Sequence, residues 1–334
     1  MAMELSDREY LLRLYDRVWS MVSEALEFVR EPTKPAFGVV DWEDFIAEAF
    51  PRNDGARIRV STAFVRTLEQ QCDPFVGSLL TADASNGASE TEVRGCLLEL
   101  AVSFVVLHEI CHVLCGHVAV LVPGDGRTTT SDALRERRHF YFREVEADWA
   151  AVDCLTLACT LPALASYLSI AEDVSLDELT DRARVDGYRI LFAAVALATL
   201  QVETLRSNSE HPDTRHPMPE ARFLAVTHSM MKTYAGIDRS KLSEEQAEYA
   251  RDYLLKVSRP VVAHLLENAA NGYIVRLLKS LLEDIVGVVA PSAAPKGPGG
   301  AELVAIYEDS WELRKALQGK RLLVDGNDAP GVEV

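Results

Sequence analysis

A helix that carries polar residues inside an apolar run is the strongest constraint on how this chain can fold. The segment VVLHEICHVLCGHV, residues 105–118, places three histidines and one glutamate among apolar side chains. Ser89 and Glu92 precede it with the spacing of a capping box, which predicts a long helix over about 91–120. Burial of charged or strongly polar side chains is costly unless other groups compensate them. The fold must therefore bring compensating groups to this helix.

His108-Glu109-Ile110-Cys111-His112 forms the pattern H-E-x-x-H on the expected helix. Residues four apart on a helix differ by about 40° and rise about 6 Å, so both imidazoles project from one face. Two such histidines can bind one zinc ion. Glu109 lies about 100° round the helix from His108, so it flanks the metal instead of adding to its ligands. That is the position of a general base for metal-activated water.

A third histidine, His117, comes directly after Gly116 near the end of the same segment. The pattern H-E-x-x-H-x-x-G-x-x-H of other zinc peptidases is not met, because Gly116 is one place too late. On a continuous helix His117 would lie about 180° round from His108 and about 13 Å along the axis. The spacing therefore predicts a histidine at the helix end or on the surface, and not a third ligand.

A catalytic zinc site needs a third protein ligand and an open position for water. The segment FREVEADWAAVD contains Glu144 and Asp148, which share one helix face because they are four apart. Ala147 is small enough to let two helices come close. We expect Glu144 to be the third ligand and Asp148 to hold a ligand imidazole from behind, with Glu146 as the fallback ligand. The alternative is a solvated acidic face that forms salt bridges with Arg143.

A third polar cluster lies in the segment HPDTRHPMPEARF. His216 and Pro217 precede an expected helix whose first turn suits Pro219 and Glu220. A histidine at a helix entrance near zinc could stabilise an oxyanion or cap the metal in a resting form. The alternative is a loop histidine, with Arg222 on a helix surface six residues later.

The three motifs in this order, H-E-x-x-H, E-x-x-A-D and H-P-x-x-x-x-R, resemble those of the gluzincin metallopeptidases. The similarity is greatest to the CAAX-prenyl-endopeptidase and HtpX-like group, and a soluble, H-E-x-x-H-bearing phage-exclusion type of bacterial peptidase is another candidate relative. The resemblance implies one zinc ion bound by His108, His112 and Glu144. It further implies roles for the remaining motif residues, namely Glu109 as general base, Asp148 behind a histidine ligand, and His216 and Arg222 near the active site.

The resemblance covers about residues 56–223 and implies a mainly α fold, a zincin-like metalloprotease core with a small edge strand or sheet. The segment RIRVSTAFV lies where that family has an edge strand able to pair with an extended substrate. The transmembrane helices of the membrane-bound relatives have no counterpart in this sequence. We therefore expect a soluble member of the group.

Charge and apolar runs exclude several classes of partner. A net charge of -17 argues against sequence-independent binding to nucleic acid and against docking on anionic lipid. The longest apolar runs, 190–200 and 100–107, are shorter than the roughly 18–20 residues that span a bilayer, so no membrane insertion is expected. The N-terminus lacks the pattern of a secretory signal, and the six cysteines contain no C-x-x-C pair. These features predict a cytoplasmic location and reduced thiols.

The N-terminal part should combine helices with one strand. Apolar residues at helical spacing predict a first helix over 4–30, and Asp41 is expected to cap a short helix. Ile58 and Val60 alternate with arginines, which predicts a strand, followed by a helix over about 63–71.

Most of the remaining chain is expected to be helical. Helices are predicted over about 131–159, 161–171, 176–206, 218–235, 243–268, 272–288 and 302–317. The predicted regions are an N-terminal helical region (1–55), a zinc metallopeptidase core (56–235), a C-terminal helical region (236–290), and a flexible linker, short helix and tail (291–334).

The expected function is a soluble, zinc-dependent endopeptidase that hydrolyses peptide bonds with metal-activated water and Glu109 as base. One alternative is a zinc-stabilised helical regulatory or interaction protein without catalysis. A second is a regulatory metalloprotease with a single protein substrate, kept latent by a loop or by the C-terminal segment. Protein or peptide substrates are the expected partners, and the sequence does not predict the oligomeric state.

Overall fold

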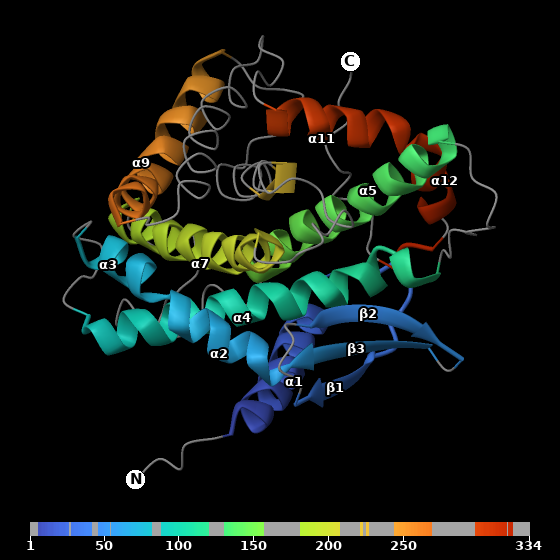
Figure 1. The fold of residues 1–334 in the computed structure, drawn as a ribbon, viewed down its shortest axis with the longest axis horizontal. Coiled ribbons are helices and arrows are strands. Elements are labelled where there is room, and N and C mark those ends of the chain that lie inside the picture. The colour runs from blue at the N-terminus through green and yellow to red at the C-terminus, as the bar shows by residue number, and fades with distance from the viewer. Residues whose placement is uncertain are drawn as a thin grey trace.

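The computed structural model describes residues 6–26, 28–41, 46–53, 55–81, 88–119, 130–156, 181–207, 221–222, 225–226, 244–268, 298–318 and 320–322. These residues form a mainly helical protein with one small three-stranded sheet, so the predicted fold class is confirmed. Figure 1 shows the long helix α4 between the sheet and α1 on one side and the helices α5 and α7 on the other.

Helix α1, Asp7–Ala25, begins at a capping box formed by Ser6 and Glu9. Its apolar residues recur at helical spacing, so they fall on one face and pack into the main core. The fully or almost fully buried residues of this face are Leu11, Leu14, Tyr15, Val18, Trp19 and Val22. The helix is shorter than predicted. Its last residue is Ala25, because Leu26 has extended backbone angles.

The sheet contains β1 (Ala36–Val40), β2 (Ala47–Arg52) and β3 (Gly55–Ser61) in the order β1-β3-β2. β3 pairs parallel to β1 and antiparallel to β2. The predicted strand is therefore correct, but its predicted position at the edge is wrong, since β3 is paired on both sides. A short helix was expected after Asp41. Residues 42–45 lie outside the described part of the chain, and Ala47–Arg52 forms a strand, so the described residues contain no such helix.

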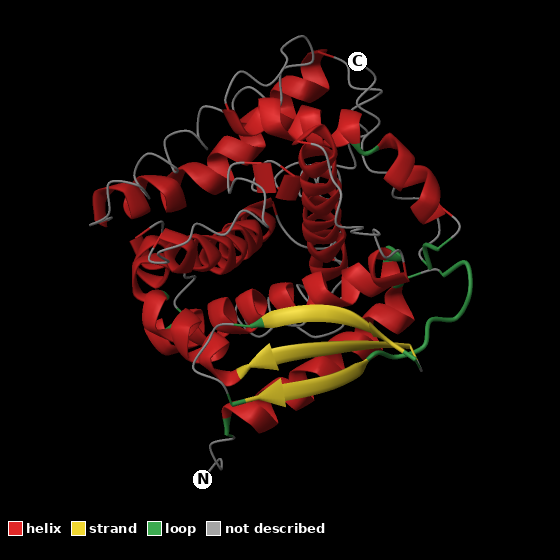
Figure 2. Cartoon of the chain, turned by 45° about the vertical axis from the view of Figure 1, so that its right-hand side comes forward, coloured by secondary structure: helices red, strands yellow, loops and turns green. Residues whose placement is uncertain are grey.

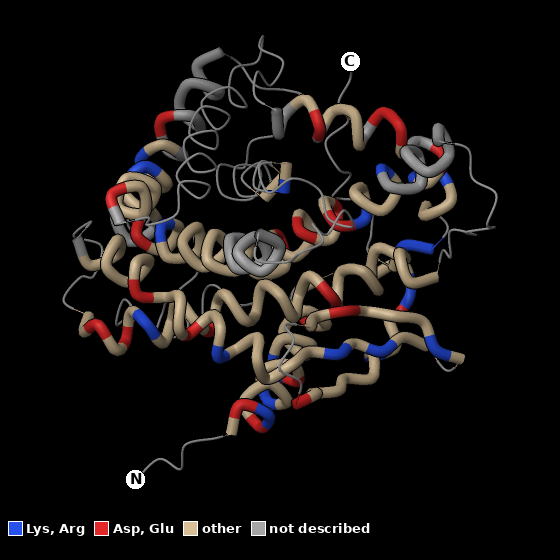
Figure 3. Tube along the Cα trace, viewed as in Figure 1, with Lys and Arg blue, Asp and Glu red and all other residues tan. Residues whose placement is uncertain are grey.

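The predicted helix that follows β3 is confirmed as α2 (Thr62–Gln71), and α3 (Asp73–Thr81) comes after it. Helix α4, Glu90–Leu114, begins at the predicted capping box of Ser89 and Glu92. Every residue from Leu100 to Cys111 is buried. Charged residues lie mainly in its first turns, and Figure 3 shows the largely uncharged stretch that follows.

Among the described helices, α4 alone is long and apolar enough to cross a membrane. Its histidines and Glu109 interrupt the apolar stretch, so the uninterrupted run 100–107 is only a part of it. Most of the apolar stretch is packed inside the fold.

The later helices pack above α4 in Figure 1 and form the second part of the fold. Helices α5 and α7 both contact α4, while α9 lies against α3 and α7. Their bounds are Thr130–Cys154 for α5, Asp181–Ser207 for α7, Glu244–Asn268 for α9, Pro298–Asp309 for α11 and Trp311–Gln318 for α12. The helix predicted over 302–317 is thus two helices separated at Ser310.

Several predicted elements fall outside the described residues. The predicted helices over 161–171 and 272–288 lie there entirely, and only four residues of the one over 218–235 are described, all of them helical. The predicted boundary near residue 236 also lies outside.

Helix α5 separates two apolar clusters. Ala147, Ala151 and Val152 face α4 and belong to the main core. The opposite face packs against α11 and α12 in a smaller cluster, and these helices lie at the upper right of Figure 1. That cluster contains Phe142, Val145, Trp149, Ala225, Ile306, Leu313 and Leu317. Figure 2 shows from a second direction that the sheet lies on the other side of the molecule from these C-terminal helices.

Candidate metal centre

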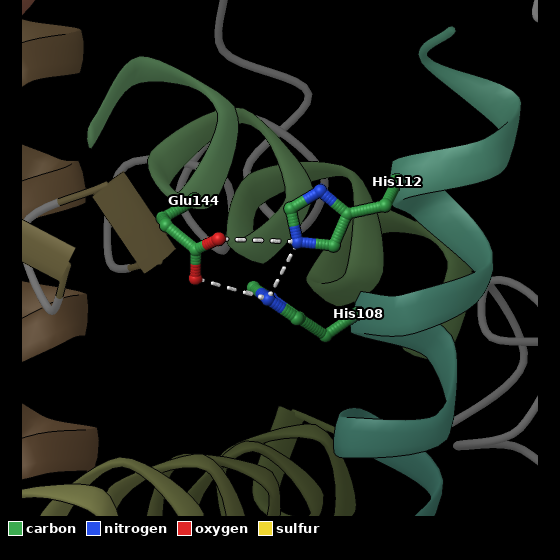
Figure 4. Close-up of side chains that lie close together, drawn as sticks. All are labelled: His108, His112 and Glu144. Atoms are coloured by element: carbon green, nitrogen blue, oxygen red, sulfur yellow. Dashed lines mark hydrogen bonds and ion pairs between the residues drawn. The ribbon is translucent and has the colours of Figure 1, made fainter. Parts of the chain in front are cut away.

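Two helices bring three ligand-type side chains to one point. His108 and His112 project from α4, and Glu144 approaches from α5 (Figure 4). The two Nε2 atoms lie 3.1 Å apart. The oxygens of Glu144 lie 3.5 Å from His108 Nε2 and 3.4 Å from His112 Nε2. The spacing of four residues therefore places the imidazoles as expected, and the predicted third ligand faces both of them.

The spacing of these donor atoms suits a zinc ion. Ligand atoms bound tetrahedrally to zinc at about 2.0–2.2 Å lie about 3.3–3.6 Å from one another. The three observed separations of 3.1–3.5 Å are close to that range. Nitrogen and carboxylate oxygen are also the donor types that zinc accepts. The residues present could therefore hold this metal and leave a fourth position open.

The electrostatics of the three side chains favour a cation. Burial alone would raise the pKa of Glu144, but hydrogen bonds from His108 and His112 hold it well below its usual range. Burial would likewise lower the pKa of His108, yet Asp148 and Glu144 raise it to about 10. Two buried carboxylates thus stabilise positive charge at this imidazole, and a bound metal ion would satisfy the same demand.

Glu109 flanks the site from its position next to His108 on α4. Its side chain is buried, and burial raises its pKa while His108 and His112 lower it. Glu48 of β2 is near enough to raise this pKa further. The predicted base is therefore close enough to the ligand pair and to Glu48 of β2 for their charges to shift its pKa.

His108 is supported from behind by a carboxylate and an arginine. Its Nδ1 lies 2.8 Å from an oxygen of Asp148, although somewhat off the ideal direction for an N–H hydrogen bond. Arg222 donates two hydrogen bonds to Asp148, of 2.6 and 2.7 Å. Asp148 thus lies where the sequence predicted it. Arg222 is buried and pairs with Asp148, so the alternative of a helix-surface arginine is wrong.

His117 lies at the helix end, as predicted, but the alternative of a surface position is wrong. Helix α4 stops at Leu114, and Gly116 adopts a φ of +80°, a conformation that favours glycine. This turn brings His117 back beneath His112, where its side chain is 2% exposed. The Nδ1 atoms of the two rings lie 2.9 Å apart. Burial lowers the pKa of His117 to about 4, so the ring is neutral near pH 7.

Glu146, the predicted fallback ligand, belongs to the surroundings of His117. One of its oxygens lies 2.7 Å from His117 Nε2, and the other accepts a hydrogen bond from Arg321. Cys115, His117 and Glu146 also lie close enough to be considered as a second metal-binding group. The 2.7 Å separation is that of a hydrogen bond and is too short for two ligands on one tetrahedral zinc. Burial also raises the pKa of the Cys115 thiol.

The remaining predicted residue, His216, lies outside the described part of the chain. Sequence reasoning did not predict the contact of His117 with His112, and it predicted no role for Arg321. The signal for His117 was Gly116, a residue that commonly ends a helix. Arg321 carried no local signal, because its partner Glu146 is 175 residues away in the chain.

The fold and the site together define a helical protein whose central helix presents a candidate metal centre beside a buried glutamate. A family model described as Peptidase U49 matches residues 62–234, which is just over half of the chain. The chain belongs to the peptidase U49 family. No curated protein and no solved structure matches it. The matched residues include both helices that supply the candidate ligands, and the protein is therefore a peptidase that acts on proteins or peptides.

Proposed function

We propose that this peptidase is a zinc-dependent endopeptidase of the gluzincin type, related in its motifs to the CAAX-prenyl-endopeptidase and HtpX-like group. The observation that carries the proposal is the triangle of His108, His112 and Glu144, whose donor atoms have separations suited to one zinc ion. Glu109 lies beside the triangle without belonging to it, as the base of such an enzyme should.

In this proposal the zinc ion would lower the pKa of a water molecule and polarise the scissile carbonyl. Glu109 takes a proton from the attacking water and later delivers it to the leaving amine nitrogen. Asp148 and Arg222 hold the ring of His108 so that its Nε2 faces the site. His216 remains the proposed oxyanion donor.

The strand that could pair with an extended substrate is β2, and not β3 as the sequence suggested. β2 is an outer strand of the sheet and contacts both α4 and the short 3-10 helix η1, His117–Ala119. Figure 1 shows β2 as the strand nearest to α4. Glu48 on this strand is also near enough to Glu109 to shift its pKa. A peptide added along β2 would therefore pass the proposed base.

The test begins with the metal content of the purified protein and with digestion of casein, with and without a chelator. We expect one zinc ion per chain and proteolysis that the chelator stops. Glu109→Gln should keep the zinc but lower the rate by about 10²–10⁴-fold, because it removes the base. His112→Ala should lose both zinc and activity.

The matched control is Glu99→Gln, which changes a glutamate on the surface of the same helix that pairs with Arg17. Its rate should equal that of the wild type. A Glu109→Gln variant with the wild-type rate would contradict the assigned base. If the wild-type protein binds one zinc ion but does not digest casein, the result would instead favour the alternative of a zinc-stabilised protein without catalysis.

A further inference from the structure

The imidazole of His112 is held by a chain of three side chains from three separate parts of the sequence. His117, from η1, lies 2.9 Å from its Nδ1. Glu146, from α5, lies 2.7 Å from the far nitrogen of His117. Arg321 follows α12 and pairs with the other oxygen of Glu146. This series of contacts thus runs from a candidate zinc ligand to Arg321, one of the last residues that the structure describes.

The hydrogen bonds along this chain are compatible with only one direction of donation when His112 binds metal through Nε2. Nδ1 of His112 then carries the ring proton and donates a hydrogen bond to Nδ1 of His117. His117 must consequently carry its own proton on Nε2, which donates to Glu146. Arg321 then supplies the positive charge that compensates the buried carboxylate of Glu146. Every contact in the series is satisfied when zinc occupies the site.

The backbone that carries Arg321 is tied to the end of the zinc-ligand helix. Residues 320–322, here called the C-terminal strap, lie against the turn after α4. Leu322 donates a backbone hydrogen bond to Leu114 of α4 and accepts one from Val29, each of 2.8 Å. One of the carbonyls left unpaired at the helix end is thereby satisfied by a residue far along the chain. A Cβ atom on Gly116 would come within 2.8–2.9 Å of Lys320, so the strap fits only against glycine.

We propose that Arg321 is a positioning residue for the zinc ligand His112, so that the C-terminal strap is a structural part of the active site. The inference rests on the zinc peptidase function proposed above. This role differs from the alternative in which the C-terminal segment keeps the enzyme latent. Helix α11 packs on α5, and the apolar residues of α11 contact the face of α5 that points away from the main core. Arg321 also lies beyond residues 62–234, so the part of the chain that matches the family does not contain the complete site.

The experiment measures zinc affinity by competition with a chelator, and the absorption spectrum of the cobalt-substituted protein, for full-length Arg321→Met and Arg321→Lys. Methionine keeps the apolar stem but removes the charge, while lysine keeps the charge without the planar fork. We expect Arg321→Met to bind zinc about 10- to 100-fold more weakly and to show an altered cobalt spectrum. Arg321→Lys should recover part of the loss. The control is Arg17→Gln, which breaks an exposed ion pair between α1 and α4 and should change neither readout.

A second variant keeps the test decisive if Arg321→Met folds poorly. In Glu146→Gln/Arg321→Met the buried charge and its partner are removed together, while the amide oxygen can still accept from His117. We expect this double variant to fold and to bind zinc more weakly than the wild type, because the charged support behind His117 is missing. Wild-type zinc affinity in the folded double variant would contradict the positioning role.

Wild-type zinc affinity and an unchanged cobalt spectrum in folded Arg321→Met would overturn the positioning role alone. A wild-type protein that binds no zinc, or binds it equally well after His108→Ala, would overturn the proposed function and this inference with it.

Discussion

The two candidate zinc-ligand histidines are held in different ways. His108 contacts a carboxylate directly, since Asp148 lies against its Nδ1 and is fixed by two hydrogen bonds from Arg222. His112 contacts a second imidazole, and only behind that ring does a carboxylate and arginine pair follow. Both supports therefore end in an Arg–carboxylate pair, which is buried for Arg222 and Asp148 and partly buried for Arg321 and Glu146, but one support contains an extra histidine.

The difference means that the candidate metal site would depend on both local and distant parts of the chain. The support of His108 lies wholly within residues 62–234, the part that matches the peptidase family. The support of His112 needs the turn at Gly116 and the C-terminal strap as well. The first support therefore needs only α4, α5 and Arg222, whereas the second also needs the C-terminal strap.

The largest expected effect comes from removing the two buried carboxylates in turn. Asp148→Ala should lower the free energy of unfolding by about 3–5 kcal/mol, because Arg222 loses its buried partner. It should also weaken zinc binding more than Glu146→Ala does, because Asp148 touches a ligand ring and Glu146 acts through His117. Chelator competition and denaturant unfolding of both variants measure these effects.

Asp148→Asn provides the matched control, since it keeps the shape of the side chain and removes the charge. We expect it to bind zinc about 10- to 100-fold more weakly than the wild type. Equal zinc affinities for Asp148→Ala and Glu146→Ala would contradict the distinction between a direct and an indirect support.

Sequence reasoning succeeded wherever a single helix decides the geometry. The spacing of His108 and His112 fixes their common face, and Glu144 and Asp148 likewise share a face of α5. Ser89 and Glu92 marked the start of α4 because a capping box is a local pattern. These predictions required no knowledge of distant contacts.

The predictions that did not hold depended on where helices stop or on which elements meet. The surface alternative for His117 assumed a continuous helix, whereas Gly116 turns the chain. The family resemblance placed β3 at the sheet edge, and the alternating residues could not correct this, because they indicate a strand but do not reveal its neighbours. No local pattern marks Arg321, since its role arises from a contact across 175 residues.

A smaller effect is expected at the turn that separates the two supports. Gly116→Ala should lower the free energy of unfolding by about 1–2 kcal/mol, because its positive φ is unfavourable for other residues. The added Cβ would also push against the backbone of Lys320 and displace the strap. Zinc affinity should therefore fall together with stability, and a titration with a chelator can measure it. Loss of stability with unchanged zinc affinity would show that the strap does not act on His112.

The smallest effect tests whether the consequence of Gly116→Ala belongs to its position or to any glycine near α4. Gly95 lies on the exposed side of the same helix, and a Cβ there would meet nothing within 4 Å. Gly95→Ala should raise the free energy of unfolding by about 0.5–1 kcal/mol, because alanine loses less conformational freedom than glycine on forming a helix. Its zinc affinity should equal that of the wild type, since Gly95 is distant along α4 from His108 and from the strap. The midpoint temperatures of thermal unfolding of the two variants should therefore shift in opposite directions. A lower midpoint for Gly95→Ala would show that α4 does not tolerate a methyl group even where the structure leaves space for one.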